Sequence, residues 1–330
     1  MVTKSSSYYK KQVREMWDKI FSQDSEKFRD FYFRNKYSHH NTLIYVEDEK
    51  VVSSLQNLDY NLLFNNKSYA VSYISGACTF EEYRGKGYAG LLIKEALRED
   101  YKNNKVFSSL IPASKELFDF YKRFGYVTSG YMKKHSFNAD KNGYSDFEII
   151  KDFETFYHLY NKNIQNKSFY LNKKNLEDYF EFLNIEKGKI ICKGKKLAIV
   201  LPFEDKYFVE FSLLDDEILI KNLEKDFIIP KFQFDSPFSM MRITNVKIFL
   251  DMIFENIIEK VPVKITDSII FENNCILIKE NNEIFFKEDI KTDVFEISVE
   301  KLLSAFLNGE KIIGFNFYER NNIKMFMMMN

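Results

Sequence analysis

The hydrophobic pattern of the first 140 residues predicts a helical start followed by an antiparallel sheet. Residues 8–35 are amphipathic at helical spacing. The positions of this stretch that we expect to be buried are Trp17, Ile20, Phe21, Phe28, Phe31 and Tyr32. Three strand-like runs follow, at 42–47, 51–64 and 68–79. The polar segment Asn65-Asn66-Lys67 between the last two runs indicates a hairpin turn.

After the third strand the pattern changes to alternating helices and strands. A helix is predicted over 88–101, because its apolar positions recur at helical spacing. The residues of that apolar stripe are Ala89, Leu92, Ile93, Ala96 and Leu97. A short strand at 107–111, a helix at 115–124 and an extended stretch at 126–137 follow. We expect Ser114 to cap the second helix and Gly125 to end it.

From about residue 145 the same order of elements starts again. The pattern predicts two helices, near 152–163 and 173–184, and then strands at 188–193, 196–202 and 206–212. Lys193-Gly194-Lys195-Lys196 is predicted to be a hairpin turn. A third unit starts near Phe238 with a helix over 245–259. Its remaining elements are short strands near 263–267, 274–280, 283–287 and 294–297 and a helix at 298–307.

The length of 330 residues agrees with several domains, since one domain usually takes ~100–200 residues. We therefore predict an α+β protein of three units, with ranges 1–145, 146–236 and 237–330. The first two units should each contain a mixed, mostly antiparallel sheet flanked by helices.

Charge and composition exclude several classes of protein. Lys plus Arg and Asp plus Glu both number 48, so the formal net charge is zero. This argues against a nucleic-acid binder and gives no support for docking on an anionic membrane. No apolar run approaches the ~20 residues of a membrane span, and the start lacks a signal peptide. The three cysteines, Cys78, Cys192 and Cys275, form no C-x-x-C pair, which favours a cytoplasmic protein. The four scattered histidines make a metal site improbable.

Four of the 11 glycines fall within fifteen residues, at Gly76, Gly85, Gly87 and Gly90. They lie where a strand is predicted to pass through a loop into a helix. Such a loop lets backbone N–H groups converge, and the helix N-terminus adds its own N–H groups, so the segment could cradle a pyrophosphate. Arg84 and Lys86 would add charged contacts. The spacing fits neither a nucleoside-triphosphate loop nor a dinucleotide-binding βαβ unit. The alternative is a glycine turn that only joins strand to helix.

Residues Arg84-Gly85-Lys86-Gly87-Tyr88-Ala89 match [QR]-x-x-G-x-[GA], and Tyr121-Lys122-Arg123-Phe124-Gly125-Tyr126 match Y-x-x-x-G-[FY]. With the predicted order of elements, these motifs resemble the GNAT superfamily of N-acetyltransferases. The resemblance implies acetyl-CoA as co-substrate. It also implies a pyrophosphate site at Gly85, Lys86, Gly87, Tyr88 and Ala89, with Arg84 alongside.

The resemblance further implies direct attack of a primary amine on the thioester in a ternary complex. Tyr121 would protonate the leaving thiolate, since a tyrosine of pKa ~10 stays protonated at neutral pH. Backbone N–H groups of Ala77, Cys78 or Thr79 would hold the acetyl carbonyl. Alternatively, Tyr121 is only a half-buried aromatic side chain on its helix. Cys78 is not expected to be a nucleophile, because its apolar strand offers no histidine partner.

The three-unit layout resembles the Eis (enhanced intracellular survival) family, which has a GNAT domain, a degenerate GNAT-like domain and a sterol-carrier-like domain. Segments 241–246, 263–267 and 296–309 are similar to the third of these. The resemblance implies a homo-oligomer, with a hexamer as one form. It also implies that the C-terminal carboxylate, here on Asn330, is the base. Met329 stands where an acidic residue would help to bind a cationic acceptor, which argues against a polyamine or aminoglycoside.

Other functions stay open from the sequence. A GNAT core could hold acyl-CoA as a sensor without turnover. The third unit could carry lipid, although its alternation of apolar and charged residues is typical of an ordinary sheet face. The amine acceptor could be a small molecule or a lysine side chain of a peptide or protein.

Overall fold

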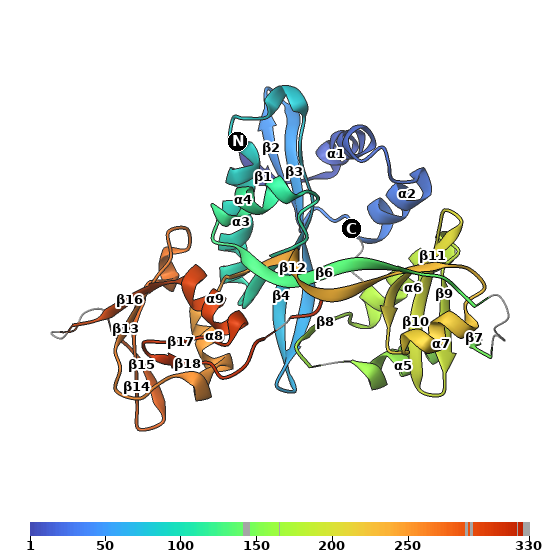
Figure 1. Cartoon of the computed structure of the whole chain (residues 1–330). Helices are drawn as coiled ribbons and strands as arrows, with labels where there is room; N and C mark the ends of the chain where they lie inside the picture. Colours follow the sequence, from blue (N-terminus) through green and yellow to red (C-terminus); the bar gives the residue numbers. More distant parts are fainter. Residues whose placement is uncertain (141–145, 165, 288–289, 291–292, 322, 326–330) are drawn as a thin grey trace.

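The computed structural model describes residues 1–330 except 141–145, 165, 288–289, 291–292, 322 and 326–330. Figure 1 shows a first unit built on two long central strands, a second unit to the right and a third to the left. The elements of the first unit are β1 (Val2–Lys4), α1 (Ser7–Ile20), α2 (Glu26–Asn35), β2 (Thr42–Glu47), β3 (Lys50–Phe64), β4 (Lys67–Thr79), α3 (Tyr88–Lys102), β5 (Phe107–Leu110), α4 (Lys115–Lys122) and β6 (Val127–Phe137). The mixed α+β prediction is confirmed.

The sheet of the first unit runs in the order β1-β2-β3-β4-β5. Its pairs are antiparallel except β4 with β5, which are parallel. The β3–β4 hairpin turns at Asn65 and Asn66, whose φ angles of 49° and 60° are tolerated well by asparagine. The hairpin prediction is therefore confirmed in position and in cause.

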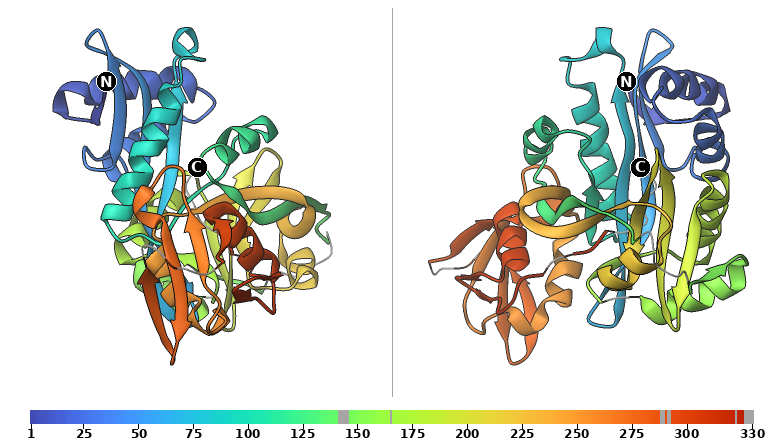
Figure 2. Two further views of the ribbon diagram at one scale, coloured as in Figure 1. Left: turned by 90° about the vertical axis from the view of Figure 1, so that its left-hand side faces the viewer. Right: turned by 45° about the vertical axis from the view of Figure 1, so that its right-hand side comes forward.

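Helices cover both faces of this sheet (Figure 2). On one face, α1 and α2 bury Trp17, Phe31 and Tyr32. On the other face, α3 and α4 form a separate apolar cluster that contains Leu92, Ile93 and Tyr121. Of the positions expected to be buried, Ile20 and Phe21 are only partly buried at the edge of the first cluster.

The second unit repeats the order of the first. Its elements are β7 (Glu148–Ile150), α5 (Phe153–Asn163), β8 (Ser168–Tyr170), α6 (Lys173–Ile185), β9 (Lys189–Lys193), β10 (Lys196–Phe203), β11 (Lys206–Ser212), α7 (Asp216–Asn222) and β12 (Phe227–Ile243). Here β11 and β12 form the parallel pair, as β4 and β5 do in the first unit. Lys193 and Lys196 face each other across the turn at Gly194, whose φ is +64°, as the sequence predicts.

Strand β12 is the longest element that the sequence analysis misses; β1, β7, β8 and α7 are also not predicted. Phe227 and Ile228 at its start pair with β11. Residues between Phe227 and Met241 pair with β6, and Met240–Ile243 pair with β5. One twelve-stranded sheet therefore joins the first two units. Pro230 and Pro237 conceal the strand in the sequence, because proline usually interrupts a sheet. The register of β12 shifts around Pro237. β12 also passes through 236 and 237, where the sequence analysis divides two units, and the three domain ranges stay a prediction.

The third unit has a four-stranded sheet in the order β15-β14-β13-β16. Its elements are α8 (Val246–Met252), β13 (Val263–Thr266), β14 (Cys275–Glu280), β15 (Glu283–Lys287), β16 (Phe295–Ser298), α9 (Val299–Asn308), β17 (Lys311–Ile312) and β18 (Phe315–Asn316). Three 3₁₀ turns, at Glu81–Tyr83, Phe254–Asn256 and Phe271–Asn273, complete the chain. The helix predicted over 245–259 is wrong in length, because α8 ends at Met252 and a 3₁₀ turn follows. The sterol-carrier-like assignment stays a prediction.

Gly76 lies at an irregularity of β4, where the register against β3 shifts between Ser54 and Gln56. Its φ is +58°, and a Cβ there would lie 2.1 Å from Cζ2 of Trp17. Trp17 cannot move away easily, since it packs on Tyr32 with ring centroids 4.5 Å apart. Glycine is therefore required here both by backbone conformation and by space.

We expect Gly76→Ala to lower the unfolding free energy of the first unit by about 2–5 kcal/mol, combining left-handed strain with overpacking. Gly194→Ala is the matched control, because its φ is +64° but a Cβ there meets nothing within 4 Å. The control should lose only about 1–2 kcal/mol. Urea titration followed by fluorescence of Trp17, the single tryptophan, measures both. Equal losses would show that the contact with Trp17 is not a constraint.

Candidate active site

The glycine loop connects the end of β4 to the start of α3. Gly85 and Gly87 have φ angles of +78° and +82°, and a Cβ at either would meet nothing within 4 Å. The protein therefore requires these glycines for their backbone conformation, while the space above them is open. Arg84, Gly85, Lys86 and Gly87 are exposed. A ligand could approach the backbone of this loop directly.

The N-terminus of α3 carries no internal cap. Gly87 occupies the N-cap position, no side chain accepts a hydrogen bond there, and the first turn contains no acidic residue. The first N–H groups of the helix, from Tyr88 and Ala89 onward, thus lack intrahelical partners and lie at the positive end of the helix dipole. These features are suited to binding an anion such as a phosphate.

Strand β2 lies beside the glycine loop, and the sequence analysis does not connect this strand with the site. Glu47 accepts a hydrogen bond from the hydroxyl of Tyr88 at 2.6 Å and pairs with Lys86 at 3.5 Å. The Tyr88 ring stacks on Tyr45 with centroids 3.9 Å apart. The hydrogen bond from Tyr88 is the main cause that lowers the pKa of Glu47, so Glu47 stays ionised. Glu47 thereby holds Lys86 beside the loop until a stronger anion competes for it.

The pairing of β4 with β5 covers only Val71–Tyr73 and Phe107–Ser109, and we call the place beyond these residues, where β4 continues without β5, the opening between β4 and β5. The irregularity at Gly76 bends β4, and Pro112, just after β5, cannot donate a hydrogen bond. Ala77 and Thr79 are half-buried at this opening and Cys78 is buried. Their backbone N–H groups lie on a strand that has lost its β5 partner, as an acyl-binding role would need.

Cys78 has the properties of a structural thiol. Its Sγ lies 3.4 Å from the Ser54 hydroxyl, and burial raises the thiol pKa to about 12. The thiol therefore stays protonated at neutral pH, which makes it a poor nucleophile. The carbonyl of Cys78 accepts a hydrogen bond from the Ser53 hydroxyl at 2.9 Å.

Tyr121 lies on the last turn of α4 and is 7% exposed. Burial, with a smaller contribution from the nearby Cys78, raises the pKa of its phenol to about 12. The structure therefore brings Tyr121 near the β4 side of the opening. Its ring packs edge-on against Tyr126 at 5.8 Å, and the Tyr126 hydroxyl is 2.7 Å from that of Ser108. Tyr121 is thus more deeply buried than the half-buried aromatic side chain that the sequence analysis gives as the alternative, and its phenol stays protonated.

The predicted base, the carboxylate of Asn330, lies outside the described residues. The chain just before it is well packed: Ile323 is 1% exposed and Met325 is 4% exposed. Lys324 forms an isolated parallel β-bridge with Ser168 of β8, and its carbonyl accepts a hydrogen bond from the Phe169 N–H at 2.9 Å. Strand β8 in turn pairs with β3. The residues of the tail from Ile323 to Met325 are therefore held beside β8, which itself pairs with β3 of the first unit.

The second unit contains no equivalent of the glycine loop. Residues 213–215 connect β11 to α7 where the loop would be. The N-cap residue Asp215 and the first-turn residues Asp216 and Glu217 are all acidic. Negative charge at a helix N-terminus repels a phosphate. This segment therefore supports the prediction of a degenerate unit.

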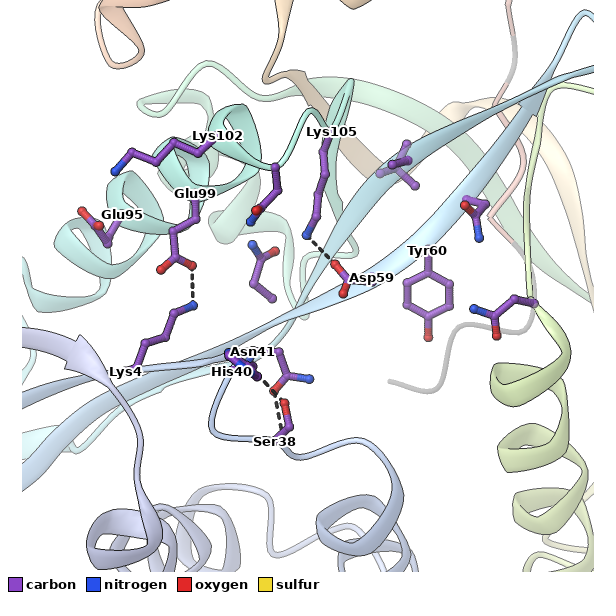
Figure 3. A pocket seen from close by; sticks show the side chains of 16 residues that line it. Lys4, Ser38, His40, Asn41, Asp59, Tyr60, Glu95, Glu99, Lys102 and Lys105 are labelled. Atoms are coloured by element: carbon purple, nitrogen blue, oxygen red, sulfur yellow. Dashed lines mark hydrogen bonds and ion pairs between the residues drawn. The ribbon is translucent and has the colours of Figure 1, made fainter.

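A polar cavity of about 840 Å³ lies away from the glycine loop (Figure 3). Lys105 pairs with Asp59 at its wall, and Lys4 pairs with Glu99. Its α3 residues, Glu95 to Lys102, belong to the C-terminal half of a 15-residue helix whose other end carries the loop. At ~1.5 Å per residue, Glu95 lies about 10 Å and Lys102 about 20 Å along α3 from Tyr88. The cavity is lined by none of residues 84–90, so it is separate from the candidate site.

The sequence of the first unit matches a known family. Residues 2–128 match the Acetyltransferase (GNAT) domain. No curated protein is significantly similar in sequence to the chain.

Solved structures similar to the whole chain share its fold. A probable N-acyltransferase from Enterococcus faecalis aligns with a TM-score of 0.72 and 16% identity over 93% of this chain and 89% of that one. A GCN5-related N-acetyltransferase from Anabaena variabilis aligns with a TM-score of 0.71 and 17% identity, over 93% and 89%. Eis1 from Mycobacterium abscessus aligns with a TM-score of 0.70 and 11% identity, over 94% and 90%. The predicted fold, with a GNAT sheet and a second GNAT-like unit, is confirmed.

Across the described ranges no His, Cys, Asp or Glu side chains gather in threes to form a metal site, and a metal-free site stays a prediction. None of the helices in those ranges combines the length and the apolar run that crossing a membrane requires.

Proposed function

We propose that this protein is an acetyl-CoA-dependent N-acetyltransferase that acetylates a primary amine. The observation that carries the proposal is the uncapped N-terminus of α3, preceded by Gly85 and Gly87 in left-handed conformations, beside the opening between β4 and β5. The match of residues 2–128 to a GNAT acetyltransferase domain supports it. The acceptor would be a small molecule or a peptide amine.

Each candidate residue has a role in this proposal. Gly85, Lys86, Gly87, Tyr88 and Ala89 hold the pyrophosphate through backbone N–H groups, with Arg84 as a further cation. The N–H groups of Ala77, Cys78 or Thr79 donate to the acetyl carbonyl. The amine lone pair attacks the carbonyl carbon, a C–N bond forms and the C–S bond breaks. The Asn330 carboxylate takes a proton from the ammonium form of the acceptor, which frees the lone pair for this attack, and Tyr121 gives its proton to the leaving thiolate.

Replacing Gly87 tests whether the glycine loop and the uncapped N-terminus of α3 bind acetyl-CoA. Ala at a φ of +82° strains the loop and places a methyl group where the ligand would approach, so Gly87→Ala should weaken acetyl-CoA binding at least about tenfold. Gly194→Ala is the control, with a similar φ but a position in the second unit. Calorimetry measures the affinity, and release of free thiol with a panel of amines measures turnover. Unchanged affinity in Gly87→Ala would contradict the loop as the binding site. Tight binding by the wild type without turnover on any amine would favour a sensor.

Tyr121→Phe should lower kcat about 10²–10⁴-fold, the usual size of a general acid's contribution, with acetyl-CoA affinity unchanged. Tyr131→Phe is the matched control, because Tyr131 stacks on Phe234 on the β6–β12 ribbon. A pKa of about 12 keeps Tyr121 protonated, and the acid is lost only as pH rises through that value. Wild-type kcat should therefore show no alkaline loss from this group below a pH of about 10. A decline at lower pH that disappears in Tyr121→Phe would show that burial does not set this pKa.

Extending the chain beyond Asn330 should impair catalysis, because the terminal carboxylate would become an amide. We expect a ~10²-fold or larger fall in kcat, in the range of a lost general base. A cleavable C-terminal extension provides its own control, since cutting after Asn330 should restore the rate. Full activity with the C-terminal extension in place would exclude the carboxylate as base.

A further inference from the structure

Gly125, four residues after Tyr121, lies between two side chains from the last third of the sequence. Its φ is +79°, and a Cβ there would be 2.7 Å from Arg242 Nε and 2.7 Å from Glu300 Oε1. Arg242 lies on β12 and Glu300 on α9. The segment that follows the candidate acid is therefore enclosed by residues distant in sequence.

Arg242 is one of the most unusual groups in the structure, a guanidinium with no exposed surface. Its Nη2 donates to Oδ1 of Asp267, while Nε and Nη1 find no hydrogen-bond partner among the residues that the structure describes. A buried cation with unmet donors is costly, so its position must be enforced by its neighbours. Here the enforcing neighbour is the Asp267 carboxylate.

Asp267 is itself held firmly. Its Oδ1 accepts hydrogen bonds from the backbone N–H groups of Ile269 at 2.9 Å and Ile270 at 3.0 Å. Its Oδ2 accepts one from Asn273 Nδ2 at 2.9 Å. A carboxylate held by this many donors is fixed in orientation, and so gives Arg242 a fixed partner.

The loop that carries Asp267 also reaches the surroundings of Tyr121. Ile269 and Ile270 belong to the same buried cluster as Tyr121 and Tyr126. Arg242 is the register partner of Ser108, whose hydroxyl is 2.7 Å from that of Tyr126. The pair thus contacts the α4 end through Gly125 and supports the Tyr126 ring that packs on Tyr121.

We infer that Arg242, fixed by Asp267, is a positioning residue that sets the place of Tyr121 for acetyl transfer. This inference rests on the proposed function for its catalytic consequence, but its structural part does not. Arg242 touches no reacting atom and acts through Gly125 and Tyr126. The third unit thereby contributes to catalysis by a route separate from the C-terminal tail.

The test is a double-mutant cycle with Arg242→Met, which replaces the cation by an apolar side chain and leaves Asp267 its other three donors. A displacement of about 1 Å can cost ~10²-fold, so we expect kcat to fall by that order with acetyl-CoA affinity unchanged. In a Tyr121→Phe background, Arg242→Met should lower kcat no further. Equal fold losses in both backgrounds would overturn the inference, because a purely structural role acts independently of Tyr121.

Lys264→Met is the matched control, since it breaks an exposed pair with Glu296, 2.8 Å apart, in the same part of the chain. This variant should keep wild-type kcat. If Arg242→Met does not fold, Asp267→Asn serves as the second variant, because it removes the charge and keeps an acceptor oxygen for Ile269 and Ile270.

Tyrosine ¹³C NMR provides a readout that does not need turnover. The Tyr121 signal is identified by its loss in Tyr121→Phe, and it should shift in Arg242→Met or Asp267→Asn but not in Lys264→Met. If the wild type transfers no acetyl group to any amine, the proposed function fails while this measurement still decides the positioning role. An unmoved Tyr121 signal in both Arg242→Met and Asp267→Asn would overturn the positioning role.

Discussion

The separation of β4 from β5 is the constraint on which the candidate site depends. The two parallel strands pair over three residues only, and Ala77 and Thr79 of β4 lie beyond that pairing. Any backbone N–H group there that does not pair with β3 needs an acceptor from elsewhere. The irregularity at Gly76, which Trp17 packs against, and Pro112, two residues after the end of β5, both disfavour further pairing of the two strands. The glycine loop then adds the N–H groups of an uncapped helix at the mouth of the same opening.

The comparison between the first two units shows that the fold alone does not make the site. In both units a helix connects the two strands of the parallel pair, yet α3 begins after two left-handed glycines, whereas α7 has an acidic N-cap and two acidic residues in its first turn. The first arrangement attracts an anion and the second repels one. The difference lies in a few residues at a helix start, where the electrostatics of phosphate binding are decided.

The sequence is most informative where one residue type has one physical reason to be present. Gly85, Gly87 and the asparagines of the β3–β4 turn require left-handed backbone, so their positions predict the loop and the hairpin correctly. The apolar stripe of α3 and the short strands of the third unit are also found where the pattern predicts them. Such elements are defined by local spacing, which a single sequence displays.

Long-range pairings leave little trace in the sequence. β12 is concealed by Pro230 and Pro237 and takes its partners from β5, β6 and β11. Glu47 belongs to neither sequence motif, and its role beside Lys86 follows only from β2 lying next to α3. Arg242 has the appearance of a surface residue, but it is fully buried because Asp267 neutralises it. Each case depends on a partner far away in the chain, which spacing cannot reveal.

Amide hydrogen exchange with and without acetyl-CoA tests the central claim most directly, because it observes the N–H groups themselves. The account predicts slower exchange at residues 85–90 and 77–79 when acetyl-CoA is added, with little change at the acidic start of α7. Unchanged exchange throughout both segments at saturating acetyl-CoA would contradict it.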